Sequence, residues 1–172
     1  LLIGGAGWDI AVALATADGA DSFYGGGSVD TADYGRRTSP VNVSLDGVAD
    51  DGAPGEGDNI ATTVGEVYGG SGDDTLSAHA SRGAVLHGFA GDDTLIGGDG
   101  NDHLFGGPGD DMLTGGGGDD TVIGEDGDDT ALALSDADGS DLFFGGGGVD
   151  TAHYGRRTTT VYVSLDGVGN AG

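Results

Sequence analysis

Aspartate recurs at every ninth residue between Gly88 and Leu132, always in the same place within a glycine-rich segment. The five consecutive nonapeptides read GFAGDDTLI, GGDGNDHLF, GGPGDDMLT, GGGGDDTVI and GEDGDDTAL. Each has glycine at positions one and four and aspartate at position six, and the first four have leucine or valine at position eight. A carboxylate held in a turn beside backbone carbonyls offers oxygen ligands to a hard cation such as calcium, which takes about six to eight of them.

Other chemistries lack the residues that they need. The chain has no cysteine for a thiolate site, no lysine for a phosphate-binding loop and no glutamate placed to close an EF-hand loop. No Ser/His/Asp set stands out from a background this rich in aspartate, so we expect no catalysis. The histidines show no metal-ligand spacing and are expected on the surface: His79, His87, His103 and His153.

The nine-residue period predicts the elements that must position these aspartates. Glycines at positions one and four let the backbone take positive φ and turn sharply, and the residue at position eight anchors a short strand. Two repeats make one coil of 18 residues. Because stacked strands lie about 4.8 Å apart, turns in successive coils can share one ion. The predicted pairs are Asp93 with Asp111, Asp102 with Asp120, and Asp111 with Asp129, so Asp111 should matter more than Asp93.

Three successive nonapeptides, GGDGNDHLF, GGPGDDMLT and GGGGDDTVI, resemble the repeats-in-toxin (RTX) family, because they match its pattern GGxGxDxUx at every specified position. The resemblance implies an all-β, right-handed parallel β-roll in which position-six aspartates and turn carbonyls hold calcium. It also implies export through a one-step secretion channel, with folding delayed until the chain meets the calcium outside the cell. The chain is therefore expected to be secreted or displayed at the cell surface.

Position-six aspartates are the candidate calcium ligands. They are Asp93, Asp102, Asp111, Asp120 and Asp129 in the regular run, and Asp9, Asp21, Asp30, Asp74, Asp141 and Asp150 in less regular turns. Some turns depart from the family pattern, because Ser28 and Glu125 replace glycines. Others have only alanine at position eight, which buries little apolar surface: Ala11, Ala32, Ala131 and Ala152.

The sequence also repeats at an interval of 120 residues. Residues 18–48 and 138–168 agree at 23 of 31 positions, and three-residue insertions between turns recur at the same offset. In the stretch without nonapeptides, Val41, Val43 and Leu45 alternate with polar residues and predict a half-buried strand. The segment 46–59 is expected to be an exposed loop. We divide the chain into β-roll repeats at 1–33, a strand-and-loop insert at 34–68, repeats at 69–153 and a truncated second insert at 154–172.

The charge excludes several kinds of partner. The formal net charge is −25, with 27 aspartates, 3 glutamates, five arginines and no lysine. Nucleic acids and anionic membrane surfaces require a basic surface and are poor partners. No apolar run approaches the length of about 18 residues that a membrane span needs. Such a charge favours disorder unless a counter-ion compensates it, so we expect folding to require calcium.

The sequence therefore predicts a calcium-binding repeat module without catalysis of its own, which supports a larger secreted or surface protein beside neighbouring repeat modules. One alternative is the carrier region of a toxin or hydrolase whose catalytic domain lies elsewhere. Another is an adhesin or matrix-layer module that binds glycan or a cell surface. Apolar residues at position nine would serve that role unless the insert or a neighbouring module covers them: Ile96, Phe105, Ile123, Leu132 and Phe144. Arg36-Arg37 and Arg156-Arg157 are expected to pair with nearby acids.

Overall fold

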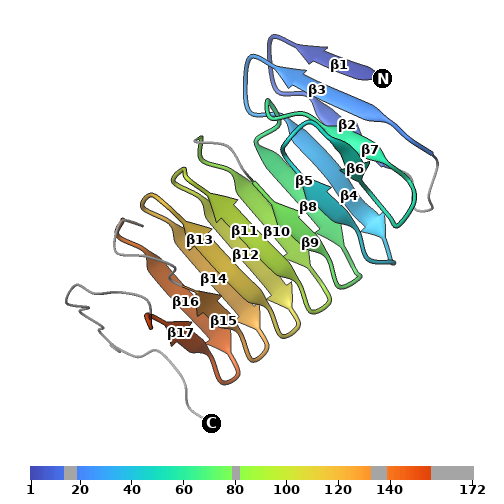
Figure 1. Ribbon diagram of the computed structural model, residues 1–172. Helices are drawn as coiled ribbons and strands as arrows, with labels where there is room; N and C mark the ends of the chain where they lie inside the picture. The colour runs from blue at the N-terminus through green and yellow to red at the C-terminus, as the bar shows by residue number, and fades with distance from the viewer. Residues whose placement is uncertain (14–18, 79–81, 133–138, 156–172) are drawn as a thin grey trace.

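Short parallel strands stack along one axis to form a roll (Figure 1). The computed structural model describes residues 1–13, 19–78, 82–132 and 139–155. Within these ranges the regular elements are all strands, and no helix capable of crossing a membrane is present. The strands of the first half are β1 (Leu2–Gly5), β2 (Ile10–Val12), β3 (Ser22–Gly26), β4 (Thr31–Arg37), β5 (Asn42–Ser44), β6 (Ala49–Asp51), β7 (Asp58–Ile60) and β8 (Glu66–Gly70). Those of the second half are β9 (Thr75–Ser77), β10 (Val85–Phe89), β11 (Thr94–Gly98), β12 (His103–Pro108), β13 (Met112–Gly116), β14 (Thr121–Asp126), β15 (Thr130–Leu132), β16 (Leu142–Gly147) and β17 (Thr151–His153).

From β8 to β17, consecutive strands alternate between two parallel sheets. The seven-stranded sheet has the order β16-β14-β12-β10-β8-β4-β2, and the six-stranded sheet has the order β17-β15-β13-β11-β9-β5. Each coil in this part of the chain therefore contributes one strand to each of the two sheets, as the nine-residue period predicted, whereas β1 and β3 lie in a separate four-stranded sheet. The all-β fold class and the parallel β-roll are confirmed.

The coils differ in length without interrupting the strand pairing. Leu95 pairs with Leu113 at the regular spacing of two nonapeptides. Val67 pairs with Leu86 across the segment that carries one extra residue, and Val122 pairs with Phe143 across a three-residue insertion. The insertions thus lengthen the turns, while the side chains keep the same face of each strand.

Position eight points into the space between the two sheets. Leu95, Leu104 and Leu113 have no exposed surface. Equivalent residues of neighbouring coils continue the core in both directions: Ala32, Val43, Val67, Leu76, Leu86 and Val122. Since each coil buries only two such side chains, the core is a narrow column of stacked apolar residues.

Glycine at position one has a different role from the one that we expected. Positive φ occurs at position four, as at Gly91 (φ 124°), and at position two, as at Gly107 (φ 118°), but not at Gly88 in position one. A methyl group on Gly88 would instead collide with Asp93 Oδ2 and with the carbonyl oxygen of Gly106 in the next coil. Position one therefore requires glycine because oxygen atoms from two coils approach it closely.

The expectation of an exposed loop over residues 46–59 is only partly right, because residues 46–50, 54 and 55 are exposed but the segment contains two strands and several buried residues. Strands β6 and β7 form an antiparallel pair there, and β7 joins β3 and β1 in a four-stranded sheet. Asp51, Glu56 and Asp58 are buried. Val41, Val43 and Leu45 are buried around β5, which confirms the predicted strand. Composition misled us because these acids are satisfied inside the protein rather than by water.

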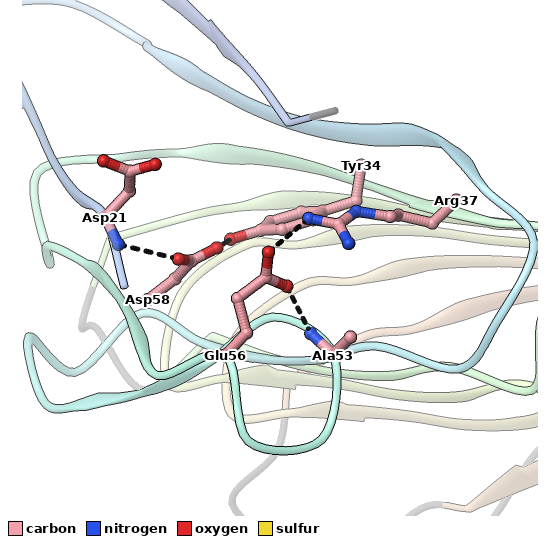
Figure 2. Close-up of polar contacts among 6 residues, drawn as sticks. All are labelled: Asp21, Tyr34, Arg37, Ala53, Glu56 and Asp58. Carbon is pink, nitrogen blue, oxygen red and sulfur yellow. Dashed lines mark hydrogen bonds and ion pairs between the residues drawn. The ribbon is translucent and has the colours of Figure 1, made fainter. Parts of the chain in front are cut away.

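A buried polar network explains why the insert accepts so many acids (Figure 2). Arg37 Nη2 donates a hydrogen bond to Glu56 Oε1 at 2.6 Å, and the Tyr34 hydroxyl donates to Asp58 Oδ2 at 2.8 Å. Glu56 Oε2 accepts from the Ala53 amide at 2.9 Å. The expected pairing of Arg37 with an acid is confirmed, although the pair is buried rather than at the surface. Arg156, Arg157 and most of the second insert lie outside the described residues, and the division into repeats and inserts stays a prediction.

Candidate metal centre

Every candidate aspartate stands directly before a strand, so the strands arrange the candidates in rows. One row lies at the start of the six-stranded sheet's strands: Asp74, Asp93, Asp111, Asp129 and Asp150. The other lies at the start of the seven-stranded sheet's strands: Asp9, Asp30, Asp102, Asp120 and Asp141. Asp21 precedes β3 in the four-stranded sheet and belongs to neither row.

The structure brings together the three pairs that the period predicted. The amide of Asp93 donates to Asp111 Oδ1 at 2.8 Å, that of Asp102 to Asp120 Oδ1 at 2.8 Å, and that of Asp111 to Asp129 Oδ1 at 3.0 Å. One carboxylate oxygen therefore fixes the stacking of each turn on the turn one coil earlier. The same bond continues both rows beyond the regular run: Asp74 to Asp93, Asp120 to Asp141, Asp129 to Asp150, and Asp9 to Asp30.

The second carboxylate oxygen has no such protein partner in most of these turns. The Oδ2 atoms concerned are buried and make no hydrogen bond among the described residues: Asp9, Asp30, Asp74, Asp93, Asp102, Asp111 and Asp129. Burying an ionised oxygen without a partner is unfavourable. The repeated pattern thus points to a cation that the protein's own side chains do not supply.

Backbone carbonyls lie beside these Oδ2 atoms. A Cβ added at Gly69 would lie 2.5 Å from Asp74 Oδ2 and 2.8 Å from the Gly88 carbonyl oxygen. The same two kinds of oxygen meet at Gly88, at Gly97 and at Gly106. Each such place joins a carboxylate of one turn to a carbonyl of the turn one coil later. Carboxylate and carbonyl oxygens are the ligands that calcium prefers, so the residues present fit that ion.

Side chains alone do not complete a metal site. Among residues 1–13, 19–78, 82–132 and 139–155, no three His, Asp or Glu side chains converge on one point. The remaining oxygens must come from turn carbonyls or water, as expected for a hard cation with many ligands. His87, His103 and His153 take no part in the two rows, and His79 lies outside the described residues.

Burial changes the acidity of the row carboxyls. It raises the pKa of Asp74 and of Asp111 to about 7 and that of Asp93 to about 6, against hydrogen bonds from backbone amides that lower them. Neighbouring carboxylates add to the rise, as Asp93 and Asp129 do at Asp111. Burial also raises the pKa of Asp102 and Asp129. Without a cation, the rows therefore favour protonated carboxyls; bound calcium would supply the positive charge that keeps them ionised.

Four aspartates are less buried than the rest. Asp21 is exposed, and its amide donates to Asp58 Oδ1 at 2.9 Å. Asp9, Asp141 and Asp150 are half-buried. Asp58 thus occupies the place of the next position-six aspartate. We did not predict this role, although Ile60 follows Asp58 at the spacing of position eight. Its other oxygen accepts from the Tyr34 hydroxyl, so a protein donor occupies the place that a cation would take (Figure 2).

A protein cation lies at the gap in the second row. Gly65 and Ala84 stand in register between Asp30 and Asp102 and supply no carboxylate. Arg82 Nη2 donates there to the carbonyls of Ser28 and Thr63, both at 3.3 Å. The only sequence feature that indicates this site is a single arginine in a degenerate repeat that lacks the aspartate.

Comparison with known families agrees with this geometry. A family model of the RTX calcium-binding nonapeptide repeat matches residues 66–81, 87–122, 96–131, 105–138 and 134–156, which together cover half of the chain. A comparison with curated proteins found no match. The matched segments include the turns in which the carboxylates of Asp74, Asp93, Asp102, Asp111 and Asp120 accept hydrogen bonds from amides of the preceding coil. The chain belongs to the family of RTX calcium-binding nonapeptide repeats.

Proposed function

We propose that this chain is a module whose folding is coupled to calcium outside the cell, and that the folded roll supports a larger secreted or surface protein. The observation that carries the proposal is the row of buried Oδ2 atoms without hydrogen bonds, repeated at Asp74, Asp93, Asp111 and Asp129. The same arrangement recurs from coil to coil, so the requirement for a cation belongs to the fold itself. It is not a local property of one turn.

The position-six aspartates are the proposed ligands. Each ion lies between two turns one coil apart, where it meets the Oδ2 of one turn and the carbonyl of the next, as between Asp93 and Gly106. Asp30, Asp74, Asp93, Asp102, Asp111, Asp120 and Asp129 are buried in their turns, whereas Asp9, Asp141 and Asp150 are more exposed. Asp21 is the weakest candidate, because it is exposed and its coil continues into the insert.

Electrostatics supports the coupling to folding. The chain has a net charge of −25, and the roll stacks carboxylates from neighbouring coils directly on one another. Repulsion among them opposes folding, while the core contributes only two position-eight side chains per coil. Because a ligand that binds only the folded state stabilises it by mass action, several calcium ions convert an unfavourable equilibrium into a favourable one.

The role outside the cell follows from the same coupling. Calcium modules of extracellular proteins bind with dissociation constants of about 10⁻⁴–10⁻³ M. Sites in that range stay empty at cytosolic calcium and fill outside, so the chain would remain unfolded before export and fold after it. The folded roll then serves as a rigid support without catalysis of its own.

The test is circular dichroism during a calcium titration, followed by chelator. We expect strand signal to develop cooperatively at millimolar calcium and to disappear when the chelator is added. Magnesium should not replace calcium, because it requires a smaller and more regular octahedral shell. Asp46→Asn, at an exposed position of the insert outside both rows, is the control and should leave the midpoint unchanged. A chain that is fully folded in excess chelator would overturn the proposal.

A further inference from the structure

Two residues in the described part of the chain have positive φ without being glycine: Phe89 (φ 77°) and Glu125 (φ 85°). Both stand at position two of a nonapeptide, where Gly107 and Gly116 have φ of 118° and 111°. A side chain in this backbone region is strained, and such strain persists chiefly at functional positions. Calcium binding by the turns does not explain why these two positions hold phenylalanine and glutamate instead of glycine.

The two residues flank one glycine on the outer face of the seven-stranded sheet. Gly107 pairs with Glu125 in the next coil, and a methyl group on Gly107 would collide with the carbonyl of Phe89 in the preceding coil. Phe89, Gly107 and Glu125 thus occupy equivalent positions in three successive coils. Between them lies a groove of about 340 Å³, lined also by His87, Phe105 and Pro108. This volume lies at the lower end of the range for small-molecule sites, about 300–1,000 Å³.

Aromatic rings build one side of this groove. His87 and Phe105 stack with ring centroids 4.6 Å apart and an interplanar angle of 4°. Phe89 stacks on His87 at 5.9 Å, and Tyr68 meets the edges of both His87 and Phe89 at 5.0 and 5.6 Å. Phe89 is 45% exposed, so the cluster leaves aromatic surface open to a ligand.

The charge at the groove is negative. The chain has only three glutamates; Glu56 is buried with Arg37, and the other two, Glu66 and Glu125, both act on His87. Burial lowers the pKa of His87, against the opposing effect of those two glutamates, so the imidazole is neutral at neutral pH. Glu125 occupies position two rather than position six, so it lies outside the rows of proposed calcium ligands.

We propose that this groove binds a small organic cation, with an ammonium group facing Glu125 and its alkyl groups against the rings of Phe89 and Phe105. Aromatic faces attract cations through their quadrupole, and quaternary ammonium ions are the ligands that such clusters suit best. The carboxylate beside the rings and the overall charge of −25 favour a cation over a neutral ligand. The proposal requires the folded roll but does not depend on which aspartates hold calcium.

The test is a titration of the calcium-saturated, ¹⁵N-labelled chain with tetramethylammonium, at constant ionic strength. We expect saturable amide shifts at His87, Phe89 and Gly107. Phe89→Gly and Glu125→Gly restore the glycine of the repeat and should preserve the fold. Phe89→Gly should weaken binding by about two- to thirtyfold, the range of a cation–π contact. Glu125→Gly should also weaken binding, because it removes the carboxylate that faces the ammonium group. Asp126→Asn removes a charge from the neighbouring exposed residue outside the groove and should have no such effect.

Four results would overturn the proposal. The first is the absence of saturable shifts in a chain whose circular dichroism shows the folded roll. The second is equal binding of tert-butanol, a neutral molecule of similar shape, which would remove the role of charge. The third is a loss of binding in Asp126→Asn as large as that in Glu125→Gly, which would indicate general attraction to an acidic surface. Binding of methyl glucoside in place of tetramethylammonium would likewise assign the groove to neutral sugars.

Discussion

The amide of Asp93 donates a hydrogen bond to Asp111 Oδ1 at 2.8 Å, across two turns that lie one coil apart. Oδ1 accepts this bond, whereas Oδ2 of Asp111 is buried without a hydrogen bond among the described residues. One carboxylate therefore has two separable tasks. It fixes the stacking of the coils through one oxygen, and in our proposal it binds the cation through the other.

The two tasks can be separated at Asp111 by two substitutions. Asp111→Asn keeps an oxygen that can accept from the Asp93 amide but removes the charge, so it should reduce calcium binding while preserving coil stacking in saturating calcium. Asp111→Ala removes both the acceptor oxygen and the charge. It should lower the free energy of unfolding by about 1–3 kcal/mol more than Asp111→Asn does, because it leaves the buried Asp93 amide without its acceptor. Chemical unfolding and calorimetric calcium titration of both variants check this. Equal stability of the two variants would contradict it.

The position of an aspartate in its row predicts how many ions it serves. Asp111 lies between Asp93 and Asp129, whereas Asp102 lies between Ala84 and Asp120. Asp111→Ala should therefore remove more bound calcium than Asp102→Ala. Asp93 also has aspartates on both sides, because the Asp74 amide bonds to it at 2.7 Å. The structure thus revises our expectation that Asp111 matters more than Asp93, and calorimetric stoichiometry should show equal losses for these two.

The calcium-free roll should be more stable in mild acid than at neutral pH. Folding raises the pKa of Asp93 to about 6 and that of Asp74 and Asp111 to about 7, above the value of about 3.9 for an unfolded chain. The folded state then binds protons more tightly, so its stability is highest below about pH 4 and is lost as the pH rises to about 7. Circular dichroism in chelator should show more strand signal at acidic pH. Asp111→Asn should weaken this dependence, and a chelated chain that gains structure as the pH rises would refute it.

In calcium, the direction of the pH effect reverses. Protons compete with the ion for the same carboxylates, so the apparent calcium affinity should fall as the pH drops through the pKa values of Asp74, Asp93 and Asp111. The midpoint of a calcium titration, measured at several pH values, should move to higher calcium in acid. A midpoint that is independent of pH would show that these carboxyls are not ligands.

A substitution at Gly88 tests whether the close approach of oxygen atoms from two coils requires glycine there. Gly88→Ala places a methyl group against Asp93 Oδ2 and the Gly106 carbonyl, so it should weaken calcium binding and cost about 1–3 kcal/mol, as overpacking does. The matched control is Gly5→Ala, because a Cβ there meets no atom within 4 Å and its φ is not positive. Calcium titration and thermal unfolding should separate the two variants. A tolerated Gly88→Ala would show that position one needs glycine for some other reason.

The buried Arg37–Glu56 pair should stabilise the insert independently of calcium. Glu56→Gln removes the carboxylate that faces a guanidinium with 1% of its side chain exposed, and breaking a buried pair typically costs about 3–5 kcal/mol. The loss should be the same size at every saturating calcium concentration. Arg36→Gln, at the exposed neighbouring position, serves as the control and should leave stability unchanged. A loss that vanishes at high calcium would tie the pair to metal binding instead.

The nine-residue period correctly predicted the features that recur in every repeat, namely a buried residue at position eight and an aspartate row at position six. Leu95, Leu104 and Leu113 are buried, and Asp93, Asp102 and Asp111 lie in rows, because a fixed nine-residue spacing returns each side chain to the same environment. The same reasoning failed at Asp51, Glu56 and Asp58. There the acids are neutralised or hydrogen-bonded by partners such as Arg37 and Tyr34, which local spacing does not reveal.

The sequence by itself determined the roll, the alternation of turns and strands, and the identity of the position-six carboxylates, since all of these follow from a repeat that each coil obeys. The tertiary structure decided which oxygen of each carboxylate is left for a cation, where Arg82 stands beside turns that lack aspartate, and how Phe89 and Glu125 meet across Gly107. These features depend on contacts between coils. Contacts of that kind arise only when residues 18 or more positions apart are stacked on one another.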